Sequence, residues 1–185
     1  MTQEVADGVL PAVDTVVFAV GRSDEATMAD IHVRGLRAVL DALPGSTGRV
    51  IYVSSTGVYA QDSGEWVDEE SVCEPAHAGG RACLSGERIL FAHERGRDAA
   101  VLRLAGLYGE GRVPRKADVI AGRPIAGSPD AYLNLIHVED AARICCEILD
   151  EHFVDQHITI TGHQSMRVGD LFEMIKEMVG KEIKF

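Results

Sequence analysis

The 185-residue chain has 29 acidic and 18 Lys or Arg side chains, a formal charge of −11, and 46% hydrophobic residues. This length and composition fit one globular domain with its own core. The acidic balance argues against partners such as nucleic acid or an anionic membrane surface, because both need a broad basic surface. No apolar run reaches the roughly 18 residues of a membrane span, and the start MTQEVADG lacks the cationic and apolar regions of a signal peptide. We therefore expect a cytoplasmic protein.

The four cysteines and seven histidines indicate neither a disulfide framework nor a metal site. Cys73 and Cys83 are isolated, and Cys145 and Cys146 are adjacent in a segment with helical periodicity, where neighbouring side chains diverge. The histidines form neither HExxH nor a Cys/His cluster at ligand spacing. We expect reduced cysteines and no bound metal.

Apolar runs alternate with helical patterns over the first two thirds of the chain. The runs predict strands at residues 14–20, 49–55 and 99–109. Helical patterns extend from Ser23 to the Pro44-Gly45 break and over the segment HAGGRACLSGERIL at 77–90, which follows an acidic loop at 61–75. This alternation indicates parallel βαβ units, so the predicted fold class is α/β, a parallel sheet flanked by helices.

The last third continues the alternation with shorter elements. Helical patterns cover 113–124, 139–152 and 168–180, and strand patterns cover 131–138 and 156–162. Gly180 is the expected C-cap of the last helix. We predict a single domain over 1–185, with a core at 1–112 and a small C-terminal α/β extension at 113–185.

Five blocks, taken in their order and spacing, carry a resemblance to a known family. They are IYVSSTGVYA, the loop that ends at Pro75, the helix with Glu87, VLRLAGLYGEGR and LNLIHVEDAA. Together they resemble the extended or atypical short-chain dehydrogenase/reductases, the NAD-dependent epimerase/dehydratase family. The resemblance covers nearly the whole chain, and it implies NAD or NADP as cofactor and a small-molecule or nucleotide-sugar-type ligand. It also implies that the sheet is a partial Rossmann-like parallel sheet, with a Rossmann-like core at 1–112 and substrate-domain-like and returning core elements at 113–185.

One part of the family pattern is missing from this chain. It contains no GxGxxG, the turn whose glycines let the family's backbone approach the dinucleotide pyrophosphate. If residues 14–20 match the family's fourth strand, the three strands before it are not encoded, and 14–20 becomes an edge strand that needs a cover. A second subunit in a homodimer, a rearranged N-terminal segment and a truncated, incomplete gene remain open as explanations.

The family's catalytic residues map onto three positions of this sequence. In active members a Ser or Thr polarises the substrate oxygen, a Tyr is the general acid/base, and a Lys four residues later lowers the pKa of that Tyr. The alignment places Ser55 at the Ser/Thr position, Gly79 at the Tyr position and Cys83 at the Lys position. Ser55 is therefore the candidate catalytic residue. The alternative is that Ser55 only satisfies backbone groups at its turn.

Four side chains are candidates to replace the missing Tyr: Tyr59, Tyr108, His77 and Cys83. The two tyrosines match family positions that are usually aromatic for structural reasons. His77 lies two residues before position 79 and titrates in the right range, and Cys83 has no identifiable base beside it. The sequence favours none of the four.

By the resemblance, residues at three strand ends line the cofactor groove, where crevices of open α/β sheets lie. They are Ala19, Val20 and Gly21, then Ser54, and then Ala105, Gly106 and Leu107. The alternative is that they are small because helices pack closely over strand ends. Arg103 is expected to neutralise a nearby carboxylate, and Arg112 is a candidate for a ligand phosphate. Leu133 stands where many sugar-nucleotide enzymes have an Arg that pairs with a substrate phosphate.

The sequence leaves two functional readings and a third, less informative one. The first is an NAD(P)-dependent epimerase, dehydratase or reductase of atypical type, with the catalytic Tyr and Lys replaced by Gly79 and Cys83. The second is a non-catalytic binding or oligomerisation module built on the same scaffold, because fold does not imply function. The third is a fragment of a longer gene.

Overall fold

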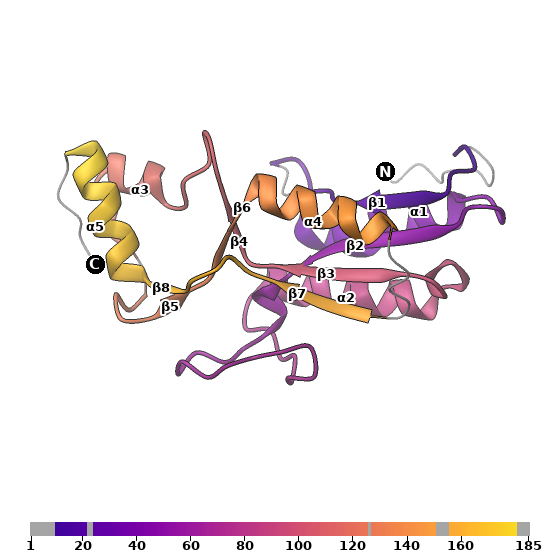
Figure 1. The fold of residues 1–185 in the computed structure, drawn as a ribbon, viewed down its shortest axis with the longest axis horizontal. Helices are drawn as coiled ribbons and strands as arrows, with labels where there is room; N and C mark the ends of the chain where they lie inside the picture. Colours follow the sequence, from indigo (N-terminus) through magenta and orange to yellow (C-terminus); the bar gives the residue numbers. More distant parts are fainter. Residues whose placement is uncertain (1–9, 22–23, 126, 151–155, 181–185) are drawn as a thin grey trace.

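The computed structural model describes residues 10–21, 24–125, 127–150 and 156–180. A parallel four-stranded sheet forms its centre (Figure 1). Its order is β1 (Thr15–Phe18), β2 (Arg49–Ser55), β3 (Ala100–Leu104) and β7 (Gln156–Ile160). In the register, Ser54 of β2 lies beside Arg103 of β3, and Arg103 lies beside Thr159 of β7. The predicted α/β fold with a parallel sheet is confirmed.

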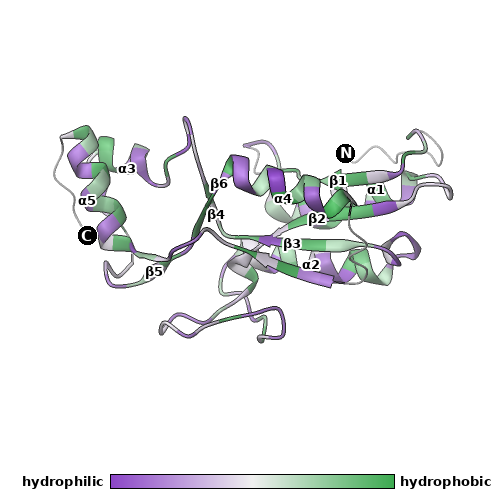
Figure 2. Ribbon diagram, viewed as in Figure 1, coloured by the Kyte–Doolittle hydropathy of each residue, from purple (hydrophilic) through white to green (hydrophobic). Residues whose placement is uncertain are grey.

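Different helices cover the two faces of this sheet. The helices are η1 (Asp30–Gly35), α1 (Leu36–Ala42), α2 (Ala78–Ala92) and α4 (Val138–Asp150). Val50 and Tyr52 of β2 pack in one core cluster with residues of η1, α1 and α2, whereas Ile51 packs in a second cluster with residues of α4. This alternation follows from the two-residue period of a strand. Figure 2 shows the hydrophobic character of β1 and β3 against the largely hydrophilic loop before α2.

A smaller third cluster lies at the far end of the molecule (Figure 1). Helices α3 (Lys116–Ile120) and α5 (Val168–Val179) contribute Val119, Leu171 and Phe172 to it. Gly180 ends α5 in the left-handed conformation, with φ 66° and its N–H bonded to the carbonyl of Lys176 at 2.8 Å, as a C-cap requires. A short antiparallel pair, β5 (Tyr132–Leu133) and β8 (Met166–Arg167), leads into this region.

The predicted strand at 99–109 is in fact two strands in two sheets. After β3, the N–H of Ala105 still bonds to Ile160 of β7 at 2.9 Å, but the N–H of Gly106 bonds to the carbonyl of Asn134 at 3.1 Å. From there β4 (Gly106–Tyr108) pairs with β6 (Leu135–His137). The chain exchanges hydrogen-bonding partners at this point, so the apolar pattern continues while the strand does not. The strand predicted at 131–138 is divided in the same way, into β5 and β6.

Among the described residues, β1 pairs with β2 alone, so it is the edge strand that the sequence indicates. The first helix differs from the prediction, because it opens with a π-helical segment, η1, before α1. Ser23 and residues 151–152 of two predicted helices lie outside the described residues. All four cysteines are free. In the part of the chain that the structure describes, no helix has the length and apolar character needed to cross a bilayer.

Candidate functional site

The carboxyl ends of β1, β2 and β3 meet at one edge of the sheet, because these strands are parallel and adjacent. Ala19, Val20 and Gly21 follow β1 and are exposed. At the end of β2, Ser54 is buried and Ser55 is half-buried. Beyond β3, Ala105 is buried, Gly106 is exposed and Leu107 is half-buried. The structure thus brings all the residues assigned to the groove to one edge, with Ser54 and Ala105 turned inward.

Two of the glycines at this edge play different parts. A Cβ added to Gly21 would meet no atom within 4 Å, so this residue faces open space. A Cβ added to Gly106 would lie 2.8 Å from Cδ2 of Leu135, closer than real Cβ atoms approach. Gly106 therefore lies close to a side chain of the neighbouring strand β6, which differs from the helix packing that the sequence left open as the alternative for these small residues.

Ser55 caps the turn that follows β2. Its Oγ accepts a hydrogen bond from the N–H of Gly57 at 3.1 Å, at the start of the 3-10 helix η2 (Thr56–Val58). A hydroxyl offers one donor and two acceptor sites, so this bond leaves the hydroxyl proton of Ser55 for another acceptor. The backbone role considered for Ser55 is present, and it does not use the group that a substrate oxygen would need.

Helix α2 begins beside this turn with Gly79 and Gly80, which face different surroundings. A Cβ added to Gly80 would overlap the carbonyl oxygen of Gly57. A Cβ added to Gly79 would have only Cγ of Met28 within reach, at 4.0 Å. Gly80 is thus required for the contact between α2 and η2, whereas position 79 has room for a side chain and carries none.

Cys83 lies one turn further along α2 and is 3% exposed. Burial, and after it the nearby charge of Glu87, raise the pKa of its thiol to about 11. The thiol is therefore protonated at neutral pH, which is the opposite of what a nucleophilic cysteine needs.

A buried ion pair joins α2 to the centre of the sheet. Arg103 donates from Nε to Oε1 of Glu87 at 3.2 Å and from Nη2 to Oε2 at 2.8 Å, a bidentate arrangement. Glu87 is 1% exposed and Arg103 is 3% exposed. Glu87 is thus the carboxylate that Arg103 was predicted to neutralise.

Further polar groups complete this network. Ser54 donates to Oε1 of Glu87 at 2.6 Å, and Nε2 of His157 lies 3.2 Å from Oε2. Burial alone would raise the pKa of Glu87, but the hydrogen bonds from His157, Arg103 and Ser54 outweigh it and lower the pKa to about 2. Glu87 is therefore a fixed negative charge inside the protein.

Tyr59 belongs to the same network. Its hydroxyl accepts a hydrogen bond from Nη1 of Arg103 at 2.9 Å and lies 2.8 Å from Oγ1 of Thr159. The centroid of its ring is 5.1 Å from Cζ of Arg103. These contacts engage the phenol in structure, in agreement with the structural interpretation of this position.

Sequence reasoning missed a second polar contact beneath α2. Nδ1 of His32, on η1, lies 2.7 Å from the hydroxyl of Tyr52, which donates to the carbonyl of Cys83 at 3.4 Å. Burial raises the pKa of Tyr52 and lowers that of His32, so both groups are neutral at pH 7. A Cβ added to Gly86 would overlap the Tyr52 hydroxyl. The only sequence signals were a Tyr and a His at otherwise apolar core positions.

The other predicted candidates lie apart from these contacts. His77 is exposed at the N-cap of α2, where its side chain makes no cap bond. Tyr108 packs edge-on against His137, with ring centroids 5.2 Å apart. Arg112 is exposed, and Leu133 packs against the third core cluster. The described residues contain no group of three or more His, Cys, Asp or Glu side chains that could hold a metal ion.

Comparisons with known sequences agree with the resemblance noted above. The sequence model of the NAD dependent epimerase/dehydratase family matches residues 2–161. Protein YeeZ of Escherichia coli K12 is 34% identical over 116 residues, which are 60% of this chain and 39% of YeeZ. The chain thus spans less than half the length of this curated relative.

Solved structures share the fold at low identity. UDP-glucuronic acid 4-epimerase from Bacillus cereus in complex with NAD has a TM-score of 0.75 and 19% identity, over 93% of this chain and 61% of its own. DesIV, a dTDP-glucose 4,6-dehydratase from Streptomyces venezuelae with NAD and TYD bound, has a TM-score of 0.76 and 23% identity, over 92% and 58%. At these identities the likeness shows the fold alone.

Proposed function

The chain belongs to the NAD-dependent epimerase/dehydratase family, and we propose that it binds NAD or NADP and a small-molecule substrate along the carboxyl edge of β1, β2 and β3. One observation supports this most. At that edge Gly21 faces open space and Ser55 keeps its hydroxyl proton, on neighbouring strands of one parallel sheet. Crevices of open α/β sheets lie at this end of the strands.

The residues present fit one part of the cofactor. The exposed backbone and small side chains at 19–21 and Gly106 would lie along the nicotinamide half, while the chain contains no GxGxxG to hold the pyrophosphate. Bound nicotinamide supplies hydride chemistry. This chain's part is to hold the substrate, with Ser55 donating its hydroxyl proton to a substrate oxygen. Leu133, which has no charge to pair with a phosphate, favours a small molecule over a sugar nucleotide.

A second candidate function is a binding module without catalysis, and a specific observation favours it. Position 79 carries no side chain, and Cys83 carries a buried thiol that stays protonated. In active members of the family a Tyr stands at the position of Gly79 and a Lys at the position of Cys83, and the charge of the Lys lowers the pKa of the Tyr. Neither group is present, so turnover requires an acid or base from outside α2.

Calorimetric titration with NADH and with NADPH tests the proposal. We expect saturable binding in the micromolar range by one or both. Gly21→Leu should weaken dinucleotide binding by about tenfold, because the leucine side chain would occupy the open space at this edge and remove at least one favourable contact with the dinucleotide. Gly45→Leu is the matched control, since Gly45 is an exposed glycine in the loop before β2, at the opposite end of the sheet.

The two candidate functions separate in a second measurement. Turnover of a small hydroxy or keto substrate by the wild type, lowered in Ser55→Ala, supports the enzyme. Cofactor binding without turnover supports the binding module. Folded wild-type protein that binds neither dinucleotide would overturn the proposal itself.

A further inference from the structure

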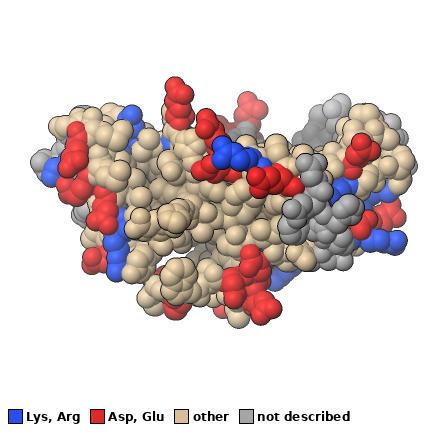
Figure 3. All heavy atoms as spheres, in the orientation of Figure 1, with Lys and Arg blue, Asp and Glu red and all other residues tan. Residues whose placement is uncertain are grey.

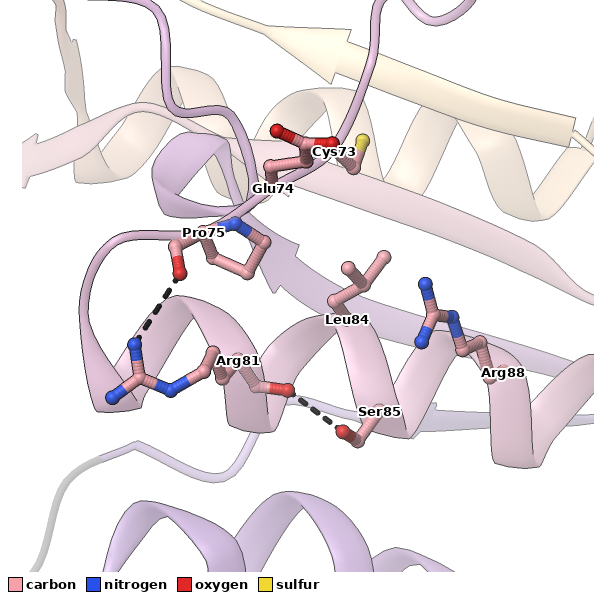
Figure 4. Close-up of a pocket in the computed structure, with 7 residues that line it drawn as sticks. All are labelled: Cys73, Glu74, Pro75, Arg81, Leu84, Ser85 and Arg88. Carbon is pink, nitrogen blue, oxygen red and sulfur yellow. Dashed lines mark hydrogen bonds between the residues drawn. The ribbon is translucent and has the colours of Figure 1, made fainter.

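A surface pocket of about 420 Å³ lies on the outer side of α2 (Figure 4). Residues 73–75 form one wall of it. The helix wall consists of Arg81, Leu84, Ser85 and Arg88. Their spacing of three, four and seven residues places them on one face of the helix. None of the residues assigned to the carboxyl edge of the sheet lines this pocket.

Arg81 is held in place at one end of this pocket. Its Nη1 donates to the carbonyl of Ala76 at 2.7 Å and to that of Pro75 at 3.3 Å. Figure 4 shows the guanidinium reaching toward the bend at Pro75. These acceptors are neutral carbonyls, so they orient the guanidinium without cancelling its charge. The remaining donors of Arg81 stay available, because a guanidinium has five N–H groups.

Arg88 stands at the other end. It is exposed, and it makes no hydrogen bond or ion pair with any residue that the structure describes. Six other arginines of the described chain form an ion pair with a carboxylate, among them Arg34–Asp30, Arg123–Asp118 and Arg143–Asp140. Arg88 thus has no carboxylate partner among the described residues of a chain of net charge −11, in which acidic side chains are abundant. Figure 3 shows them spread over one face of the molecule.

Between the two arginines the floor is apolar. Leu84 projects into the pocket in Figure 4, with Pro75 on the facing wall. Ser85 donates its hydroxyl to the carbonyl of Arg81 at 2.8 Å, so its proton is not offered to a ligand. The pocket therefore has an arginine at each end and Leu84 with Pro75 between them, and the one carboxylate of its lining is that of Glu74, on the wall opposite the helix.

We propose that this pocket binds an elongated small molecule with an anionic group, carboxylate or phosphate, at each end and an apolar middle. Arg81 and Arg88 are seven residues apart, which is about 10 Å along a helix. Figure 4 shows the two guanidinium groups at opposite ends of the pocket, so a linear dianion of matching length can contact both at once. A cavity of about 420 Å³ is within the range of small-molecule sites.

A series of linear α,ω-dicarboxylates of increasing chain length measures this separation directly. NMR titration of the wild type should show affinity that rises to an optimum at an intermediate length and then falls, with the largest amide shifts in residues 81–88. Each charge-assisted contact is worth about tenfold or more in affinity. Arg88→Gln should therefore weaken the best dicarboxylate by about tenfold and remove the length optimum.

Arg97→Gln is the matched control, because Arg97 is an exposed arginine outside the pocket. It should leave both the affinity and the optimum unchanged, as should saturating NADH. The matching α,ω-bisphosphate tells the two anionic groups apart. No binding at any length, binding without a length optimum, or equal binding by Arg88→Gln would each overturn the proposal. None of these outcomes bears on dinucleotide binding at the sheet edge.

Discussion

The inner face of α2 and the carboxyl edge of the sheet are neighbours with opposite character. Beneath α2 the buried polar side chains Ser54, Glu87 and Arg103 all have partners. At the carboxyl edge, Gly21 borders open space. Ser55 accepts a backbone hydrogen bond there, and this bond does not use its hydroxyl proton. A buried charge is stable only when it is paired, whereas a site that binds a ligand must leave groups unpaired. The contrast teaches that the buried charges beneath α2 serve the scaffold, and that the proposed ligand edge is made mostly of small residues.

The largest effect should come from breaking the buried ion pair. Glu87→Met leaves the charge of Arg103 buried without its partner, and we expect a loss of about 3 to 5 kcal/mol in the free energy of unfolding. Urea denaturation followed by circular dichroism measures it. The double variant Glu87→Met, Arg103→Met should lose less than the single variant, because no charge is then left unpaired. An equal or larger loss in the double variant would show that the pair itself contributes the stability.

Acid should weaken the same pair. The pKa of Glu87 is about 2 in the folded protein and about 4.3 in an unfolded chain. The carboxylate therefore stabilises the folded state fully above pH 4.3, and this contribution, about 3 kcal/mol, is lost as the pH falls toward 2. Unfolding free energies of wild type and Glu87→Gln should differ most at pH 6, and this difference should shrink as the pH falls below 4 and disappear only below the folded pKa of about 2. A difference that stays constant with pH would contradict the assigned pKa.

Gly80→Ala should destabilise the fold less than loss of the ion pair does. The added methyl group would overlap the backbone carbonyl of Gly57, which cannot rotate away as a side chain can. Overpacking of this kind costs about 1 to 3 kcal/mol. A thermal melt measures the change, and an unchanged Tm would mean that α2 and η2 are not in close contact.

The smallest effect is expected one residue earlier. Gly79→Ala fills open space within a helix, where alanine is favoured over glycine, so stability should stay constant or rise by up to about 1 kcal/mol. The same melt compares the two variants directly. If Gly79→Ala were as harmful as Gly80→Ala, position 79 would not have the room that distinguishes it.

The sheet and its helices could be predicted because periodicity reports burial, and β2 and α2 are buried on a regular period. The break at Ala105 could not, since hydrogen-bonding partners leave no mark on an apolar run. For the site, the sequence alone identified which family positions Ser55, Gly79 and Cys83 occupy, and it predicted that Arg103 pairs with a carboxylate. The contact of His32 with Tyr52 was not legible, because it joins residues that only the packed core brings together.

The exchange of partners after Ala105 also determines how the proposed groove is built. Ala105 remains bonded to β7, while Gly106 is already bonded to the strand pair of the C-terminal region. Gly106 and Leu107 are thus held by β6, whereas Ser55 ends a strand of the main sheet and Gly21 follows its edge strand. One wall of the proposed groove is therefore built from a different sheet than the other two, and the two sheets meet between consecutive residues of one chain segment.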